Sequence, residues 1–326
     1  MSQAARGEQF SAADRELLKA ASADGRFKDC TELTVPAVRE LALREGMEFA
    51  TAVVYDRILR KPRNQVFLDE VARSPDCVVD RDVLFAIVPG AFYRMHKHSG
   101  ADGARLIRML ETAGARVETI PIENFGRVRE NARIIAEWLE AKRPEKVVIL
   151  SLSKGSADVK CALRERPELA RHLLGWVSLS GISSGTPLVD WLQRQRWRML
   201  GIRFFFWWRG LSLNALNDLR SGGELADWSD AADELPLLNV CGFPLQRHLT
   251  HRWAPKGYRR LAPLGPNDGG GILLGEVAQR PGLVFPVWGA DHYLAPSLDC
   301  DAQLRTVLAL ASAGALRARQ ANLCEA

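Results

Sequence analysis

The chain has 326 residues, of which 47% are hydrophobic and 25% charged, and it carries a formal net charge of +5. This length suits one large domain with insertions or two domains, and this composition predicts a sizeable packed core and excludes global disorder. The basic excess is spread along the sequence, without a Lys/Arg-rich block, a zinc-finger spacing or an aromatic RNA-binding motif, so specific nucleic-acid binding is not expected.

The cysteines and the N-terminus bear on location. The six cysteines are widely spaced and include no CxxC pair, which indicates reduced thiols rather than a disulfide framework. Residues 1–16 are polar and lack the apolar stretch of a secretory signal. No run of uncharged apolar residues is long enough for a transmembrane helix. The sequence therefore predicts a cytoplasmic protein.

The first 80 residues are predicted to form an N-terminal helical extension. Residues 1–25 are polar and rich in alanine, which favours a loose tail or a surface helix. From Pro36 to Leu59, apolar residues recur at helical spacing, which predicts one long helix or a pair of helices that cover a sheet. Residues 60–81 look irregular, with a short helix near Phe67 to Ala72.

The rest of the chain alternates strand-like and helix-like segments. The predicted strands are Val83–Val88, Arg116–Ile122, Lys146–Leu152, Leu174–Leu179, Pro236–Cys241 and Gly282–Val287. Helices are predicted at Gly103–Ala113, at Val128–Leu139, from Ala157 and at Ala302–Ala311. This alternation predicts an α/β fold with a mostly parallel, doubly wound sheet. Its core would comprise residues 81–185 and 236–326, interrupted by a helical cap or lid at 186–235.

The sharpest motif lies where the third predicted strand runs into a helix. There the sequence has a small residue, Ser151, two positions before Ser153, and Gly155 two positions after it. A nucleophile elbow requires this context, because a sharp turn lifts the serine hydroxyl above the sheet and crowds the backbone on both sides. Ser151 replaces the glycine that is usual at the first position. The alternative is an ordinary loop that contains a serine.

Two residues further along the chain could complete the chemistry of Ser153. His292 follows the last predicted strand, where a catalytic base would lie, and Asp268 stands in a Pro/Gly-rich turn before it. A serine hydroxyl needs an imidazole to accept its proton, and a carboxylate to hold that imidazole in the correct tautomer. His251 is a weaker candidate for the base. Asp158 and Asp190 are alternatives for the acid, whereas Asp291, adjacent to His292, is poorly placed.

The order Ser153, Asp268, His292 resembles that of the α/β-hydrolase superfamily, particularly its lipases and esterases. The resemblance covers roughly residues 82–313, and the first 80 residues depart from it because the usual first antiparallel strands are not evident. It implies that Ser153 is the nucleophile, His292 the general base and Asp268 the group that orients the imidazole. An acyl-enzyme would form and then be hydrolysed by water.

An oxyanion hole needs preorganised N–H donors. One is predicted at the backbone of Lys154, directly after the nucleophile and at the start of a helix. The Lys154 side chain should point away from the serine, which disfavours a Ser–Lys mechanism. The resemblance implies a second donor in the loop after the first strand, at Ala91 or Phe92, and Tyr93 in the same loop is a predicted substrate-binding residue. A simple strand-ending turn is the alternative.

The cap is rich in aromatic residues, including Trp197 and the run from Phe204 to Trp208. They could form the core of the cap, or they could line an apolar acyl pocket and make weak contact with a membrane surface. Arg203 and Arg209 bracket the run and suit interfacial contact. Phe205 and Trp208 are the predicted substrate-binding residues here.

No cofactor or metal is predicted. The histidine pairs His96/His98 and His248/His251 lack a carboxylate or cysteine that would complete a metal site.

The leading hypothesis is a serine hydrolase that cleaves a carboxylic ester or thioester with an apolar moiety. The same triad could instead transfer the acyl group to another acceptor, or cleave an amide or a lactone. The chain could also be a non-catalytic relative that binds a hydrophobic ligand, or a membrane-surface or scaffold protein that uses the aromatic insertion. The retained serine, aspartate and histidine argue against a purely binding function.

Overall fold

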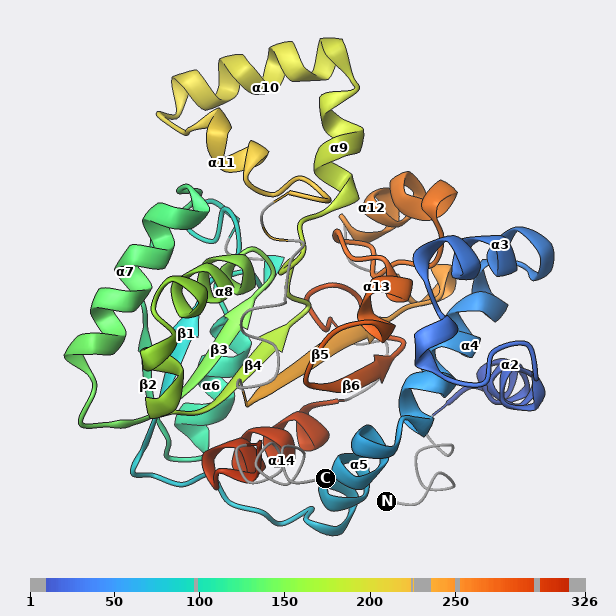
Figure 1. Cartoon of the computed structure of the whole chain (residues 1–326), viewed down its shortest axis with the longest axis horizontal. Helices are drawn as coiled ribbons and strands as arrows, with labels where there is room; N and C mark the ends of the chain where they lie inside the picture. The colour runs from blue at the N-terminus through green and yellow to red at the C-terminus, as the bar shows by residue number, and fades with distance from the viewer. Residues whose placement is uncertain are drawn as a thin grey trace. The chain divides into compact units, whose positions relative to one another are not determined.

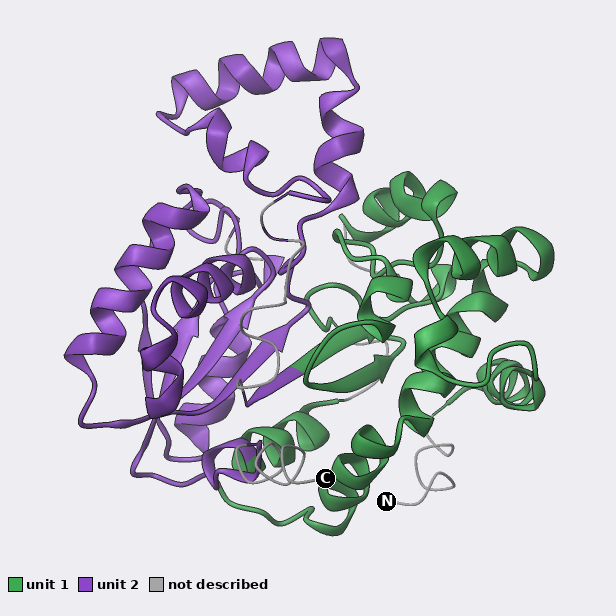
Figure 2. Cartoon of the chain, viewed as in Figure 1, with its two compact units in different colours: residues 1–78, 239–310 green, residues 79–238, 311–326 purple. Residues whose placement is uncertain are grey.

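A computed structural model describes residues 10–96, 99–223, 225, 236–249, 253–295 and 300–316. The chain divides into two compact units (Figure 2). Unit 1 comprises Met1–Val78 and Asn239–Leu310, and unit 2 comprises Val79–Leu238 and Ala311–Ala326. Within the described ranges, no helix is both long and apolar enough to cross a membrane.

Unit 2 is built on a parallel sheet (Figure 1). Its strands are β1 (Val83–Val88), β2 (Arg116–Thr119), β3 (Lys146–Leu152) and β4 (Leu173–Leu179), in the order β2-β1-β3-β4, and each neighbouring pair is parallel. β5 (Leu237–Phe243) begins beside β4, where the Trp176 N–H donates to the carbonyl of Pro236 over 2.9 Å. β1 is buried along its whole length, as expected of a continuous apolar strand with both faces covered.

Helices cover both faces of this sheet. The helices α7 (Val128–Ala141) and α8 (Gly155–Glu165) share a hydrophobic core with alternate residues of β1 and β3. On the opposite face lies α6 (Ala104–Thr112), which follows its N-cap residue Gly103. A Cβ atom on Gly103 would lie 3.1 Å from the side chain of Ile87, so the start of α6 is close to β1. The predicted α/β class with a mostly parallel, doubly wound sheet is confirmed.

The cap of unit 2 follows β4 and consists of α9 (Pro187–Gln193), α10 (Arg196–Trp208) and α11 (Leu213–Asn217) (Figure 1). Phe206 of α10 is buried, and it lies 5.5 Å from the ring of Phe125 and 6.3 Å from that of Phe92. The Arg127 guanidinium pairs with Asp218 at 3.1 Å, just after α11. One side of the cap therefore continues the core of unit 2.

Unit 1 combines the N-terminal helices with the end of the sheet. It holds α2 (Ala12–Ala23), α3 (Val35–Glu45), α4 (Met47–Arg60), α5 (Pro62–Arg73), α12 (Ala254–Leu261), α13 (Leu274–Ala278), most of β5, β6 (Leu283–Trp288) and most of α14 (Asp301–Ser312). Short 3-10 turns occur at Cys30–Glu32, Gln246–His248 and Ala262–Leu264, and in unit 2 at Pro167–His172. Residues 1–78 thus belong to the same compact unit as residues 239–310.

The N-terminal helices differ in part from the expectation. The apolar pattern from Pro36 to Leu59 is a pair of helices, which separate at Gly46 because its φ of +94° ends α3. The short helix predicted near Phe67 to Ala72 is present but longer than expected, because α5 covers Pro62–Arg73 and only the flanking residues are irregular. Pro62 starts that helix, and its buried positions include Asn64, Phe67 and Val71 at helical spacing.

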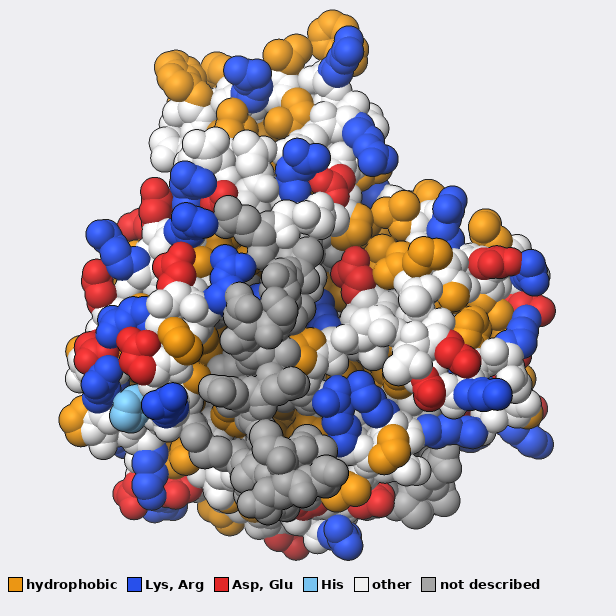
Figure 3. All heavy atoms as spheres, viewed as in Figure 1, with side chains coloured by type: hydrophobic (Ala, Val, Ile, Leu, Met, Phe, Trp, Pro, Cys, Tyr) orange, Lys and Arg blue, Asp and Glu red, His pale blue; other side chains and the backbone are white. Residues whose placement is uncertain are grey.

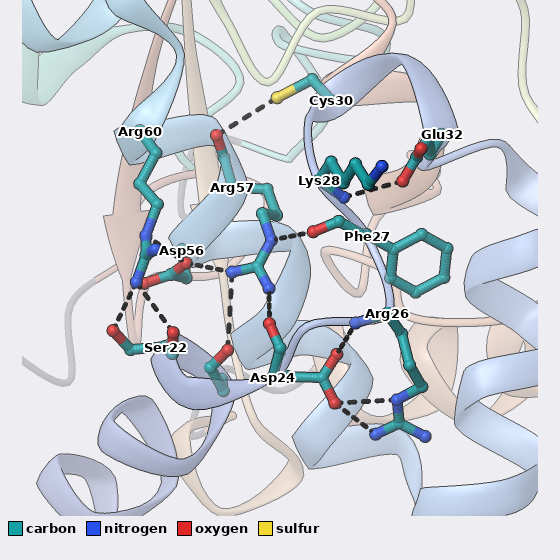
Figure 4. A network of polar contacts seen from close by, with 11 residues as sticks. Ser22, Asp24, Arg26, Phe27, Lys28, Cys30, Glu32, Asp56, Arg57 and Arg60 are labelled. Atoms are coloured by element: carbon teal, nitrogen blue, oxygen red, sulfur yellow. Dashed lines mark hydrogen bonds and ion pairs between the residues drawn. The ribbon is translucent and has the colours of Figure 1, made fainter.

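A buried arginine of α4 forms hydrogen bonds with the segment that follows α2 (Figure 4). Arg57 is 3% exposed, pairs with Asp56 and donates to the backbone carbonyls of Asp24 and Phe27, the latter over 2.7 Å. Asp56 also pairs with Arg60 at 2.8 Å. These contacts supply donors to partly buried carbonyls of the segment after α2 and partners to a buried guanidinium.

We expect Arg57→Leu to lower the free energy of unfolding by about 2 to 4 kcal/mol, because it removes one partner of the buried Asp56 carboxylate and the donors to two partly buried carbonyls. Urea unfolding followed by circular dichroism measures the change. Arg44→Leu, at an exposed pair with Glu40, serves as the control and should cost under about 1 kcal/mol. Equal losses in the two variants would contradict a stabilising role for Arg57.

Candidate active site

Ser153 lies in a strained turn of unit 2 between β3, which ends at Leu152, and α8, which begins at Gly155. Its φ is +48°, a left-handed conformation that side-chain-bearing residues seldom adopt. Two backbone hydrogen bonds hold it there: the Ser153 N–H donates to Leu179 over 3.1 Å, and the Ile182 N–H donates to the Ser153 carbonyl over 2.9 Å. A strained serine at the carboxyl end of a parallel strand has the local geometry of a nucleophile elbow.

The motif predicts small residues two positions before and two positions after Ser153, and the structure shows why at Gly155. A Cβ on Gly155 would lie 2.5 Å from the carbonyl oxygen of Pro89 and 2.6 Å from that of Val88. Ser151 stands in place of the usual glycine, and its hydroxyl is hydrogen-bonded. The Ser151 oxygen accepts the indole N–H of Trp176 over 2.7 Å and lies 2.7 Å from the hydroxyl oxygen of Ser156. Both Ser151 and Trp176 are fully buried.

We expect Ser151→Ala to lower the free energy of unfolding by about 1 to 3 kcal/mol, because the buried indole N–H of Trp176 loses its acceptor. Urea unfolding measures this loss. Ser221→Ala, at an exposed serine, is the matched control and should change stability by less than about 0.5 kcal/mol. A Ser151→Ala protein as stable as wild type would show that the hydrogen bond contributes nothing.

The loop after β1 lies beside the elbow. A Cβ on Gly90 would be 3.3 Å from the Cβ of Ser153, so the two backbones approach closely. The Phe92 N–H donates to the carbonyl of Asn124 over 2.9 Å and is therefore occupied. Within the described part of the chain, neither the Ala91 amide nor the Lys154 amide has a hydrogen-bond acceptor. Of the two residues predicted for the second oxyanion donor, Phe92 thus has its amide engaged by Asn124, and Ala91 has no such acceptor within the described residues.

The Lys154 side chain points into a buried ion pair. Its ammonium nitrogen lies 2.7 and 2.9 Å from the two carboxylate oxygens of Asp158, and the side-chain amide of Asn131 donates to the same carboxylate over 2.9 Å. Lys154 is 2% exposed and Asp158 is fully buried. The Lys154 nitrogen is thus engaged by the Asp158 carboxylate, which argues against a Ser–Lys mechanism.

Unit 1 brings Asp268 and His292 together. The Nδ1 atom of His292 lies 2.5 Å from a carboxylate oxygen of Asp268, and the residues are 4% and 1% exposed. The other Asp268 oxygen accepts the backbone N–H groups of Gly270, Gly271 and Ile272 at 2.9 to 3.0 Å. The pair has the arrangement that fixes an imidazole tautomer.

The charge of Asp268 is maintained against its burial. Desolvation by itself raises the pKa of this carboxyl, but His292 and the amides of Ile272 and Gly270 outweigh it and hold the pKa below its ordinary value. Gly270 also has to be glycine, because a Cβ there would lie 2.1 Å from the imidazole ring of His292. The glycine-rich turn thus solvates the carboxylate and leaves room for the ring.

The other predicted acids have different partners. Asp158 binds Lys154, and Asp190 lies near the surface, 3.3 Å from Arg220. Asp291 accepts the backbone N–H groups of Tyr293 and Ala295, both at 3.0 Å.

Of the other histidines considered from the sequence, His98 and His251 lie outside the described residues. His248 accepts the Leu245 N–H and lies 3.3 Å from Asp14. Within the described ranges there is no cluster of three or more histidines, cysteines, aspartates or glutamates that could hold a metal ion.

The three predicted substrate-binding residues of unit 2 differ in their exposure and contacts. The Tyr93 hydroxyl donates to the carbonyl of Ile122 over 2.9 Å. Phe205 is partly buried against the hydrophobic core. Trp208 is 65% exposed, with the Arg209 guanidinium 4.8 Å from its ring centre.

Comparison with known proteins places the fold. No protein-family model matches the sequence, and no curated protein matches it. Among solved structures, a metagenomic carboxyl esterase is similar with a TM-score of 0.54 and 19% identity, over 73% of this chain and 77% of that one. A Bacillus licheniformis lipase in its mature form is similar with a TM-score of 0.47 and 17% identity, over 68% and 90%. The chain has the α/β-hydrolase fold, as the sequence predicted.

Proposed function

We propose that the protein is a serine hydrolase that cleaves carboxylic esters or thioesters with an apolar moiety, using Ser153, His292 and Asp268. The observation that carries the proposal is Ser153 itself, held at a positive φ between β3 and α8. The hydrogen bond between Asp268 and His292 supplies the second element of a triad, and the chain order is that of α/β-hydrolases.

Each residue has one task in the proposed reaction. His292 accepts the proton of the Ser153 hydroxyl through Nε2 while the oxygen attacks the carbonyl carbon. Asp268 stays ionised and stabilises the imidazolium. The amides of Ala91 and Lys154 donate to the oxyanion of the tetrahedral intermediate. The alcohol or thiol leaves with the proton from His292, and a water molecule, deprotonated by the same imidazole, then releases the acid.

The apolar character of the substrate is inferred from the surroundings of the oxyanion loop. Phe92 stacks on Phe125 with ring centres 4.3 Å apart, and Phe206 of the cap meets both rings. Phe205 is partly buried beside them and is the cap residue we propose for substrate contact. Apolar surroundings of this kind next to the loop favour an acyl chain over a sugar or a phosphate.

A series of 4-nitrophenyl esters with increasing acyl length tests this function. We expect hydrolysis by wild type, none above background by Ser153→Ala, and a kcat/KM that rises from acetate to longer chains. Addition of an alcohol separates hydrolysis from acyl transfer, because a transferase would form a new ester. A folded protein that cleaves no member of the series would contradict the proposal and favour a binding function.

A further inference from the structure

The outer face of α10 is apolar and exposed. Five large hydrophobic side chains lie on it with exposed fractions from 57% to 86%: Trp197, Leu200, Phe204, Trp207 and Trp208. Successive residues are about 100° apart around a helix, so these five occupy one arc roughly 100° wide. Figure 3 shows hydrophobic side chains gathered along this helix. A continuous exposed face of this kind marks an interaction surface.

The fold of unit 2 does not require this face. The opposite side of α10 makes the packing contacts: Phe206 is buried, and Met199, Ile202 and Phe205 pack against the core. Apolar side chains stabilise a fold when they are buried, and those on the exposed face of α10 are not. The outer tryptophans are therefore candidates for binding rather than for stability.

Positive charge surrounds the apolar arc. Arg194, Arg196, Arg198, Arg203 and Arg209 are all exposed, and no aspartate or glutamate occurs between Trp191 and Asn217. By the same helical spacing, Arg196 and Arg203 lie along one edge of the arc, whereas Arg198 and Arg209 lie further round the segment, roughly 80° to 100° beyond the other edge. The segment thus presents an aromatic ridge with guanidinium groups along one edge and further arginines on the same exposed, acid-free segment.

We propose that α10 docks on the surface of an anionic phospholipid bilayer. Tryptophan and phenylalanine side chains favour the boundary between headgroups and acyl chains, and arginines favour anionic headgroups. The helix has 13 residues, too few to span a bilayer, so it would lie in the plane of the interface. A second copy of the chain fits less well, because a two-fold contact would bring the same arginines together without an acidic partner.

This docking goes beyond ester hydrolysis and does not depend on it. The Ser153→Ala protein should bind vesicles as wild type does. Loss of lipid binding and loss of esterase activity are therefore separate results.

Co-sedimentation of the full chain with vesicles tests the proposal. We compare vesicles of phosphatidylcholine with vesicles that contain about 30% phosphatidylserine, and expect binding at least about tenfold stronger to the anionic vesicles. High salt should reduce that difference, because it screens the arginines.

Paired variants separate the two contributions. Trp197→Ser/Trp207→Ser should lower binding to anionic vesicles at least about tenfold. Arg196→Gln/Arg203→Gln should lower it about tenfold or more, and change binding to neutral vesicles little. The matched controls are Trp253→Ser, at an exposed tryptophan of unit 1, and Arg44→Gln/Arg133→Gln, at exposed arginines. Both controls should bind as wild type.

Three outcomes would overturn the proposal. The first is equal binding to neutral and anionic vesicles. The second is unchanged binding by the double tryptophan variant. The third is a wild-type dimer in gel filtration that Trp197→Ser/Trp207→Ser dissociates, since a second copy would then be the occupant of this face.

Discussion

Replacement of His292 by alanine is expected to lower kcat for a chromogenic ester by about 10³-fold or more. In the proposed mechanism His292 accepts the proton of the Ser153 hydroxyl, and without that base a serine hydroxyl is a poor nucleophile at neutral pH. Steady-state kinetics with a short-chain 4-nitrophenyl ester measures the loss. KM should change much less than kcat, because the imidazole acts on the transition state rather than on binding of the substrate.

The matched control for this variant is His248→Ala. His248 is also a mostly buried histidine of unit 1 next to an aspartate, Asp14, but it is not part of the proposed triad. It should keep kcat within about threefold of wild type, which corresponds to under about 1 kcal/mol of transition-state stabilisation. Equal melting temperatures of His292→Ala and wild type would show that the loss is not unfolding. A folded His292→Ala protein with a tenth or more of the wild-type kcat would show that His292 is not the base.

Asp268→Asn is expected to lower kcat by about 10³- to 10⁴-fold. The substitution keeps the shape of the side chain, but an asparagine amide can hold the imidazole in the wrong tautomer and cannot stabilise its positive charge. It also removes the carboxylate that the amides of Gly270, Gly271 and Ile272 now solvate. The same ester assay measures the effect.

A second aspartate–histidine pair in unit 1 provides the control. Asp14 is 4% exposed and contacts His248, so Asp14→Asn changes a comparable buried carboxylate away from the proposed triad. It should affect stability and leave kcat near the wild-type value. If Asp268→Asn instead keeps most of its activity, the acid is another residue, and Asp158→Asn becomes the next variant to test.

Much of the fold was predictable from the order of apolar segments. The strand-to-helix step at Ser153 was placed correctly because a β-branched run ends there in small residues. β2 ends earlier than predicted, at Thr119 rather than Ile122. Pro121 explains the difference, since it has no N–H to donate to a neighbouring strand. The helix near Phe67 to Ala72 was predicted too short, because the first turn of α5 carries mostly polar residues and shows little apolar periodicity.

The details of the candidate site depend on contacts between distant residues. The sequence shows that Ser151 is small, but not that its hydroxyl accepts the indole N–H of Trp176. It shows a glycine-rich turn after Asp268, but not that Gly270 makes room for the ring of His292. The Phe92 amide is occupied by Asn124, 32 positions away, which no local pattern indicates.

The aromatic cap shows the same limit. From the sequence, its aromatic residues could equally form a core or face a ligand. The structure divides α10 between these roles, with Phe206 buried and Trp207 76% exposed, although the two are adjacent. That division depends on the rotation of the helix against the core. The rotation places Phe206 against the rings of Phe92 and Phe125.

The central claim is that the Ser153 hydroxyl is a nucleophile activated by His292. Reaction with a fluorophosphonate probe, followed by peptide mass spectrometry, tests it most directly. We predict stoichiometric labelling of Ser153 in wild type, no labelling of Ser153→Ala, and labelling of His292→Ala slower by at least about 10²-fold. A folded wild-type protein that does not react, or one that is labelled at another residue, would contradict the account.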